Sequence, residues 1–89
     1  MRIPFYSKQF EKDVELQKER GKNLKKLKEI MTLLVKGERL SLKNRDHPLI
    51  GNFRDYRECH IESDWLLIYK IEGACIYFTR NGTHSDMFE

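Results

Sequence analysis

The amino-acid sequence predicts a small α+β domain in which a helical hairpin packs on one face of an antiparallel sheet, with the element order β-α-α-β-β-β. In the first half, apolar residues recur at helical spacing in two consecutive segments. In the second half the pattern changes to three short runs rich in aromatic and β-branched residues, which is typical of strands. The chain has 89 residues, so we expect a single domain over residues 1–89.

The first two expected elements are a short strand and a helix. Residues 2–6 alternate between apolar and polar side chains, and Pro4 restricts them to an edge strand or the start of a strand. Ser7 is a favourable N-cap for a helix over 8–20. Gly21 is the residue that we expect to end this helix, because glycine adopts the left-handed conformation found after helix C-termini.

A second helix is expected to begin near Asn23 and to end at Gly37. Its apolar stripe consists of Leu24, Leu27, Ile30, Met31, Leu33 and Leu34. Only two or three residues separate it from the first helix, so the two should form an αα-hairpin.

The remaining elements are predicted to be a polar connection, three strands and a short tail. The connection covers 40–52 and the strands cover 56–61, 65–71 and 74–80. Short turns separate the strands, which therefore should pair as antiparallel neighbours. Residues 81–88 are expected to form a turn and a short terminal segment.

The predicted turns bring candidate functional residues together. A two-residue turn between the last two strands would pair Ile71 with Ala74 and therefore Trp65 with Arg80. The preceding turn leaves two alternatives open. A four-residue loop places His60 opposite Trp65 and on the face of Arg80, whereas a three-residue loop places His60 on the other face.

Charge is distributed unevenly along the chain. The net charge is +3, but residues 1–45 carry 13 Lys and Arg against six Asp and Glu, while residues 46–89 carry four against eight. A basic half is typical of a protein that binds a polyanion or an acidic partner, and a solvated, salt-bridged helix face is the alternative. No apolar run approaches the length of a membrane span, so we expect a soluble protein of the cytoplasm. Cys59 and Cys75 fit a reducing compartment as small core residues, with a disulfide as the alternative.

Five candidate catalytic residues fall in strand ends and loops: His47, His60, Asp64, Arg80 and His84. Histidine can move a proton to or from oxygen near neutral pH, and arginine can hold a phosphate through a forked pair of hydrogen bonds. Such a set suits cleavage of a phosphodiester. Taken singly, each histidine could equally be a surface residue.

These residues also fit two other interpretations. Arg80 could cap the sheet by packing on Trp65 through a cation–π contact, and Trp65 itself could be a core residue. Three histidines and an aspartate could also ligate zinc, but none of them has the spacing of a known zinc motif.

Three motifs occur together in this sequence. They are Asp46-His47-Pro48-Leu49-Ile50-Gly51, the strand pair Tyr-Arg-x-x-His-x-x-x-Asp-Trp-x-x-x-Tyr over 56–69, and Arg-x-Gly-Thr-His over 80–84. As a set they resemble the YafQ branch of the RelE/ParE superfamily, the toxins of bacterial type II toxin–antitoxin pairs. The likeness extends over nearly the whole chain.

The resemblance implies a ribosome-dependent messenger-RNA endoribonuclease that inhibits translation. Such an enzyme would require neither a metal ion nor another cofactor, because the ribose 2′-hydroxyl of the message would be the nucleophile. The active-site pattern of the family carries over to His47, His60, Asp64, Trp65, Arg80, His84 and Phe88.

Each of these residues has an expected role. His60 is the first choice for the base and His84 for the acid, although the sequence cannot decide which histidine plays which role. Arg80 and His47 would stabilise charge, and Asp64 would orient a histidine. Trp65 and Phe88 would contact RNA bases.

The resemblance also implies partners. They are a cognate antitoxin, mRNA on the ribosome with ribosomal RNA bound by the Lys-rich helices, and operator DNA for the toxin–antitoxin complex. Two alternative functions remain open at this point: a ParE-like protein that poisons DNA gyrase without being an enzyme, and an inactive RNA- or protein-binding module.

Overall fold

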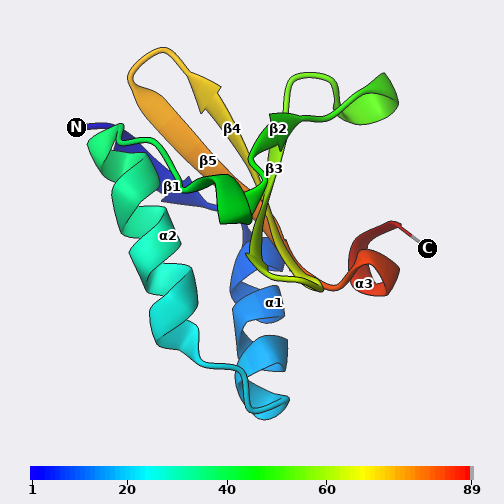
Figure 1. The fold of residues 1–89 in the computed structure, drawn as a ribbon. Coiled ribbons are helices and arrows are strands. Elements are labelled where there is room, and N and C mark those ends of the chain that lie inside the picture. Colours follow the sequence, from blue (N-terminus) through cyan, green and yellow to red (C-terminus); the bar gives the residue numbers. More distant parts are fainter. Residues whose placement is uncertain (89) are drawn as a thin grey trace.

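A five-stranded mixed sheet organises the protein, as seen in a computed structural model that describes residues 1–88 (Figure 1). The strand order is β1-β5-β4-β3-β2. The strands are β1 (Ile3–Tyr6), β2 (His47–Pro48), β3 (Arg57–Glu62), β4 (Trp65–Glu72) and β5 (Cys75–Gly82). The α+β class and the predicted order of the main elements are confirmed.

Helices α1 (Lys8–Glu19) and α2 (Leu24–Lys36) begin at the predicted caps. The Ser7 hydroxyl accepts a hydrogen bond from the Phe10 N–H, and the Asn23 side chain accepts one from the Lys25 N–H. Gly37 ends α2 with a φ of 80°, a left-handed conformation that glycine adopts without strain.

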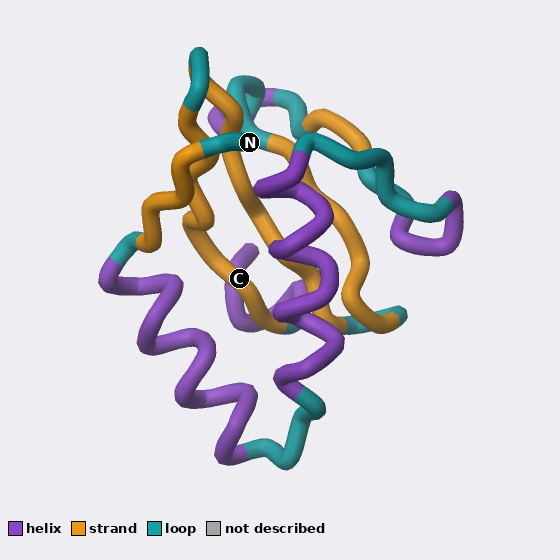
Figure 2. Tube along the Cα trace, turned by 90° about the vertical axis from the view of Figure 1, so that its left-hand side faces the viewer, coloured by secondary structure: helices purple, strands orange, loops and turns teal. Residues whose placement is uncertain are grey.

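Both helices pack their apolar stripes on one face of the sheet. The core comprises Phe10, Leu27, Ile30 and Leu34 from the helices and Cys59, Trp65, Leu67, Tyr69, Ile76 and Phe78 from the strands. A third helix, α3 (His84–Phe88), lies on the side of the sheet away from α2 (Figures 1 and 2). The face opposite the helical hairpin is therefore left for a functional site between β2, β3 and α3.

The expectation of a purely antiparallel sheet is wrong for one pair of strands. β1 runs parallel to β5, and Tyr6 is the register partner of Phe78. The helical hairpin explains this arrangement, because it carries the chain from one sheet edge across the face before the antiparallel meander begins. Short elements also form in the predicted connection and tail, namely β2, α3 and the 3₁₀ turns η1 (Leu42–Asn44) and η2 (Gly51–Phe53).

The predicted register of the last hairpin is also wrong. The observed partners are Ile71 with Ile76 and Tyr69 with Phe78, so the two-residue loop is Gly73-Ala74 and not the pair before it. Gly73 has a φ of 59°, which the primed hairpin turns require at their first central position. The loop therefore starts at the glycine.

A bulge adds one further residue to this shift. The partner of Arg80 is therefore Ile68 and not the predicted Trp65. In the preceding hairpin, Glu62 pairs with Trp65 and His60 pairs with Leu66 across a second irregularity. Neither of the two predicted loop lengths occurs. Leu66 and Ile68 nevertheless share one face of β4, so His60 and Arg80 lie on the same face of the sheet.

No helix within residues 1–88 is long and apolar enough to cross a membrane.

Candidate active site

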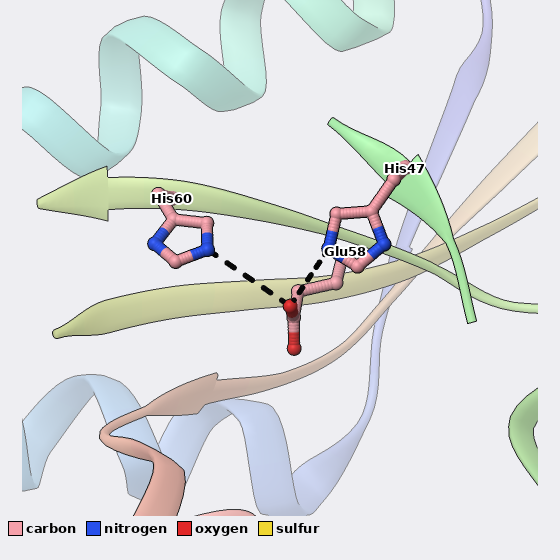
Figure 3. A group of neighbouring side chains, drawn as sticks. All are labelled: His47, Glu58 and His60. Carbon is pink, nitrogen blue, oxygen red and sulfur yellow. Dashed lines mark hydrogen bonds and ion pairs between the residues drawn. The ribbon is translucent and has the colours of Figure 1, made fainter. Parts of the chain in front are cut away.

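Two histidines face one buried carboxylate on the sheet face opposite the helical hairpin (Figure 3). His47 on β2 is the register partner of Glu58 on β3, and His60 follows two residues later on the same strand. His47 Nε2 lies 3.0 Å from Glu58 Oε2, and His60 Nε2 lies 4.0 Å from the same oxygen. The Glu58 side chain is only 6% exposed, so the two imidazoles supply much of its surroundings.

The hydrogen bonds of the two rings indicate where their protons lie. His47 Nδ1 lies 3.1 Å from the Pro48 carbonyl oxygen, while its Nε2 faces Glu58. Both ring nitrogens therefore face oxygen acceptors. His60 Nδ1 lies 3.2 Å from the Ser63 carbonyl oxygen, which assigns the proton to Nδ1 and leaves Nε2 as the basic nitrogen when the ring is neutral.

Asp46 anchors the segment that carries His47. Its carboxylate accepts a 2.6 Å hydrogen bond from the Tyr69 hydroxyl and a 3.0 Å bond from Arg57 Nε. Burial and the Asp46 carboxylate raise the pKa of Tyr69, so its hydroxyl remains a donor. These hydrogen bonds connect the residue before the two-residue strand β2 with β4 and β3.

Arg80 comes from β5 and is held by a buried carboxylate of α1. Its Nε and Nη2 atoms lie 2.8 and 3.1 Å from the two oxygens of Asp13, which is 4% exposed. These hydrogen bonds raise the pKa of Arg80, so the guanidinium keeps its charge. Arg80 is partly exposed and therefore accessible to an anionic ligand.

Helix α3 presents His84 as an exposed side chain at its first position. Thr83 and Asp86 form a reciprocal cap: the Thr83 N–H donates to the Asp86 carboxylate, and the Asp86 N–H donates to the Thr83 hydroxyl. Arg20 adds two hydrogen bonds to Asp86, at 2.7 and 3.0 Å, and they hold the pKa of that carboxyl well below its usual range.

The turn after β3 connects His60 with His84. Ser63 contributes the carbonyl oxygen beside His60, and Asp64 accepts a 3.3 Å hydrogen bond from the backbone N–H of His84. Asp64 was expected to orient a histidine ring. Its contact is with the backbone instead, so it positions the start of α3 and not an imidazole.

Trp65 is buried, so it is not accessible for the contact with RNA that the sequence predicts. It is 0% exposed, lies in the core and donates a hydrogen bond from Nε1 to Asn81 Oδ1. The register explains the difference, because Trp65 points to the helix-covered face along with Leu67 and Tyr69. Phe88 is 38% exposed, and its ring packs against those of Phe53 and His84, so it remains available to a base.

The sequence-based reasoning missed Glu58 and Asp13. Glu58 stands two residues before His60 on a strand, the spacing that places both side chains on one face, and this signal was available. Asp13 lies on a helix rich in charged residues, where nothing in the spacing distinguishes it from solvated neighbours. Cys59 lies in the core as expected, and burial raises the pKa of its thiol, which makes it a poor nucleophile.

A cavity of about 640 Å³ opens beside His60 between α2, η1 and β3. Lys26, Lys43 and Arg45 are among its lining residues, and Lys26 is paired with Glu62. Glu29 and Glu62 also line it, so the cavity is of mixed charge, and it lies on the α2 side of β3.

A small α+β domain with paired histidines, a buried carboxylate and an arginine on one sheet face has the groups for acid–base chemistry on an anionic substrate. The comparisons with known proteins identify the family. Residues 2–89 match the model of the bacterial YafQ toxins of type II toxin–antitoxin systems, and the chain belongs to that family.

Known proteins of the same size resemble this chain over almost its entire length. The mRNA interferase toxin YafQ of Escherichia coli K12 is 45% identical over 84 residues, which cover 93% of this chain and 91% of that protein. YafQ in the E. coli DinJ–YafQ complex superposes with a TM-score of 0.93 at 43% identity over 100% of both chains. A metal-bound toxin from Helicobacter pylori superposes with a TM-score of 0.92 at 37% identity, covering 99% of this chain and 100% of that one.

Proposed function

We propose that this chain is an mRNA interferase, an endoribonuclease that cleaves translated mRNA and is neutralised by a cognate antitoxin. The observation that carries the proposal is the cluster of His47, Glu58 and His60 on the same sheet face as Arg80. The names of the E. coli relatives, an mRNA interferase and a toxin in complex with DinJ, support it.

In the proposed reaction, the ribose 2′-hydroxyl attacks the adjacent phosphorus. His60 Nε2 takes the hydroxyl proton, since its Nδ1 is hydrogen-bonded to the Ser63 carbonyl. The carboxylate of Glu58, whose Oε2 lies 4.0 Å from the same Nε2, then stabilises the resulting imidazolium through its negative charge.

The departing 5′-oxygen takes a proton from His84, so the products are a 2′,3′-cyclic phosphate and a 5′-hydroxyl. Arg80 neutralises the charge that develops on the phosphoryl oxygens, and His47 contributes a second positive group. Asp64 holds the backbone of His84 in place, and Phe88 stacks on a base.

The charge distribution favours a substrate presented by the ribosome. Exposed lysines line both helices, including Lys12, Lys18, Lys25 and Lys28. These residues lie on the helical hairpin and not on the face of the histidine cluster, so we assign them to ribosomal RNA and the face of the cluster to the message. Such an enzyme works in the cytoplasm. The bound antitoxin would mask it, and the complex would recognise operator DNA.

The proposal is tested by inducing the wild type and His60→Ala and mapping breaks in translated messages by primer extension. Glu72→Gln, at an exposed position at the end of β4, serves as the matched control. We expect new breaks with the wild type and the control and none with His60→Ala. Growth arrest without RNA breaks would refute the nuclease and favour a gyrase poison.

A second experiment compares cleavage of one message by the purified protein when that message is free and when it is bound to ribosomes. Cleavage only on ribosomes supports the proposed presentation of the substrate. Equal cleavage of free RNA would refute ribosome dependence while leaving the nuclease in place.

A further inference from the structure

Two buried polar residues on α1 face β5 and α3, and an exposed arginine at the C-cap of the helix continues the row. Asp13, Gln17 and Arg20 stand at positions i, i+4 and i+7, which places them on one side of the helix. Asp13 and Gln17 are 4% and 0% exposed, a degree of burial that is unusual for polar residues on a helix of charged composition. Burial of this kind is costly unless specific partners compensate for it.

The first partner of the row is Arg80. Asp13 accepts hydrogen bonds from Arg80 Nε and Nη2 and a third, at 3.1 Å, from the backbone N–H of Asn81. Asn81 in turn accepts the Trp65 indole N–H, so the pair is embedded in the core. Within residues 1–88, Arg80 Nη1 has no hydrogen-bond partner, which leaves that end of the guanidinium for a ligand.

The second partner is helix α3. Arg20 forms the bidentate pair with Asp86, and Gln17 Nε2 lies 3.5 Å from the same carboxylate. The fit against β5 is close: a Cβ added at Gly82 would lie 2.8 Å from Asp86 Oδ2. The absence of a side chain at Gly82 therefore lets α3 dock, and Arg20 holds it there.

We propose that Asp13 and Arg20 are positioning residues of the active site, although neither touches the substrate. Asp13 sets the direction of the Arg80 fork toward the phosphoryl group, and Arg20 fixes α3 and with it His84. Helix α1 thus aligns two groups of the site from a different element of the fold. The inference rests on the proposed ribonuclease function and adds residues that the histidine cluster alone does not indicate.

The kinetic test compares Asp13→Asn and Arg20→Gln with the wild type in single-turnover cleavage of ribosome-bound mRNA. Glu15→Gln, on the same helix, and Arg39→Gln, in the loop after α2, are exposed changes of the same kind and serve as the matched controls. We expect the maximal rate to fall about tenfold to a hundredfold for each variant, with half-saturation changed less than about threefold, because misplacement of a reacting group acts on the chemical step. The controls should cleave like the wild type.

A second experiment uses NMR to test whether the Arg80 side chain and the start of α3 change their surroundings in the variants. In two-dimensional NMR of ¹⁵N-labelled protein, the Arg80 Nε–H signal should be protected from exchange in the wild type and lost in Asp13→Asn. The Thr83 amide, which donates to Asp86, should shift in Arg20→Gln and remain in place in Arg39→Gln. Arg20→Lys, which keeps one charged donor, should recover part of the rate.

The outcomes separate the two proposals. If the wild type does not cleave RNA, the proposed function fails and the positioning role fails with it. If the wild type cleaves and both variants cleave equally well, only the positioning role is refuted. Should Asp13→Asn unfold, which far-UV circular dichroism reports, Arg20→Gln decides the question because its ion pair lies at the surface.

Discussion

His47 Nε2 lies 3.0 Å from Oε2 of Glu58, a carboxylate whose side chain is 94% removed from solvent. A carboxylate so poorly hydrated depends on polar neighbours for stabilisation, and the two imidazoles lie within 4.0 Å of its Oε2. The pair therefore links a core strand to an exposed histidine that faces the substrate side.

Glu58→Gln should impair RNA cleavage while preserving the fold. The amide keeps the shape of the side chain but removes the charge that stabilises an imidazolium at His60. We expect the single-turnover rate to fall about tenfold or more, within the range for loss of an acid–base contribution. The measurement is cleavage of ribosome-bound mRNA, with Glu72→Gln as the control for loss of one negative charge. A wild-type rate for Glu58→Gln would refute the role given to this carboxylate.

Phe88→Ala should weaken binding of the message by about 1–3 kcal/mol, since an exposed aromatic ring can stack on a base. Its exposed side chain contributes little to the core, so the unfolding midpoint in urea should change little. Affinity is measured as the toxin concentration that gives half-maximal cleavage. An unchanged half-saturation would remove Phe88 from the RNA-binding surface.

Trp65→Phe should show the opposite pattern. The smaller ring leaves a cavity and deprives Asn81 Oδ1 of its donor, so the free energy of unfolding should fall by about 1–3 kcal/mol. Half-saturation by the message should stay at the wild-type value, because Trp65 is 0% exposed. A loss of affinity without a loss of stability would contradict the placement of Trp65 in the core.

Asp86 should make stability depend on pH in the acid range. Its pKa is lowered in the folded protein, chiefly by the Arg20 hydrogen bonds, whereas an unfolded aspartate titrates near about 3.9. Above that value the ionised form favours folding, and this contribution is lost as the pH falls toward the folded pKa.

Asp86→Asn should therefore cost about 1–2 kcal/mol of unfolding free energy at pH 7 and less at pH 3, where part of the charge contribution is already lost. Urea unfolding at the two pH values measures the difference, with Asp55→Asn, an exposed residue, as the control. A cost that is equal at both values would show that the Asp86 charge does not contribute to stability.

The fold was largely predictable because its signals are local. Ser7 and Asn23 cap helices whose apolar stripes are unambiguous, and β4 and β5 are rich in the residues that strands favour. The parallel pairing of β1 with β5 was not predictable from such signals, because it depends on how the helical hairpin crosses the sheet. The register of the last hairpin depended on whether Gly73 takes the first or the second loop position. That two-residue shift and the one-residue bulge together moved the partner of Arg80 from Trp65 to Ile68.

The histidines of the candidate site were predictable from the sequence, but the residues that hold them and Arg80 in place, such as Glu58 and Asp13, were not identified. His47, His60 and His84 are recognised by residue type and motif, but their arrangement follows from a bulge at 60–62 and from the cap of α3. Trp65 shows the limit of transferring a site pattern: its position matches the family motif, yet strand alternation turns its ring into the core.

A transition-metal ion should inhibit the enzyme by occupying the histidine cluster. The ligand atoms of His47, Glu58 and His60 all lie within 4.8 Å of one another, close enough to share one ion, and imidazole with carboxylate suits zinc or copper. A bound ion would take the Nε2 lone pair that His60 needs as a base. Added Zn²⁺ should therefore suppress cleavage of ribosome-bound mRNA, and a Zn²⁺-selective chelator that leaves the Mg²⁺ of the ribosome in place should restore it.

Glu58→Gln and a Cys59→Ala control separate this site from others on the protein. We expect Glu58→Gln to bind Zn²⁺ about tenfold or more weakly by isothermal titration calorimetry, since loss of one of three ligands removes a charged donor. Cys59 is buried beside the cluster without belonging to it, so Cys59→Ala should bind Zn²⁺ like the wild type. Equal affinity in Glu58→Gln and the wild type would place the inhibitory ion elsewhere.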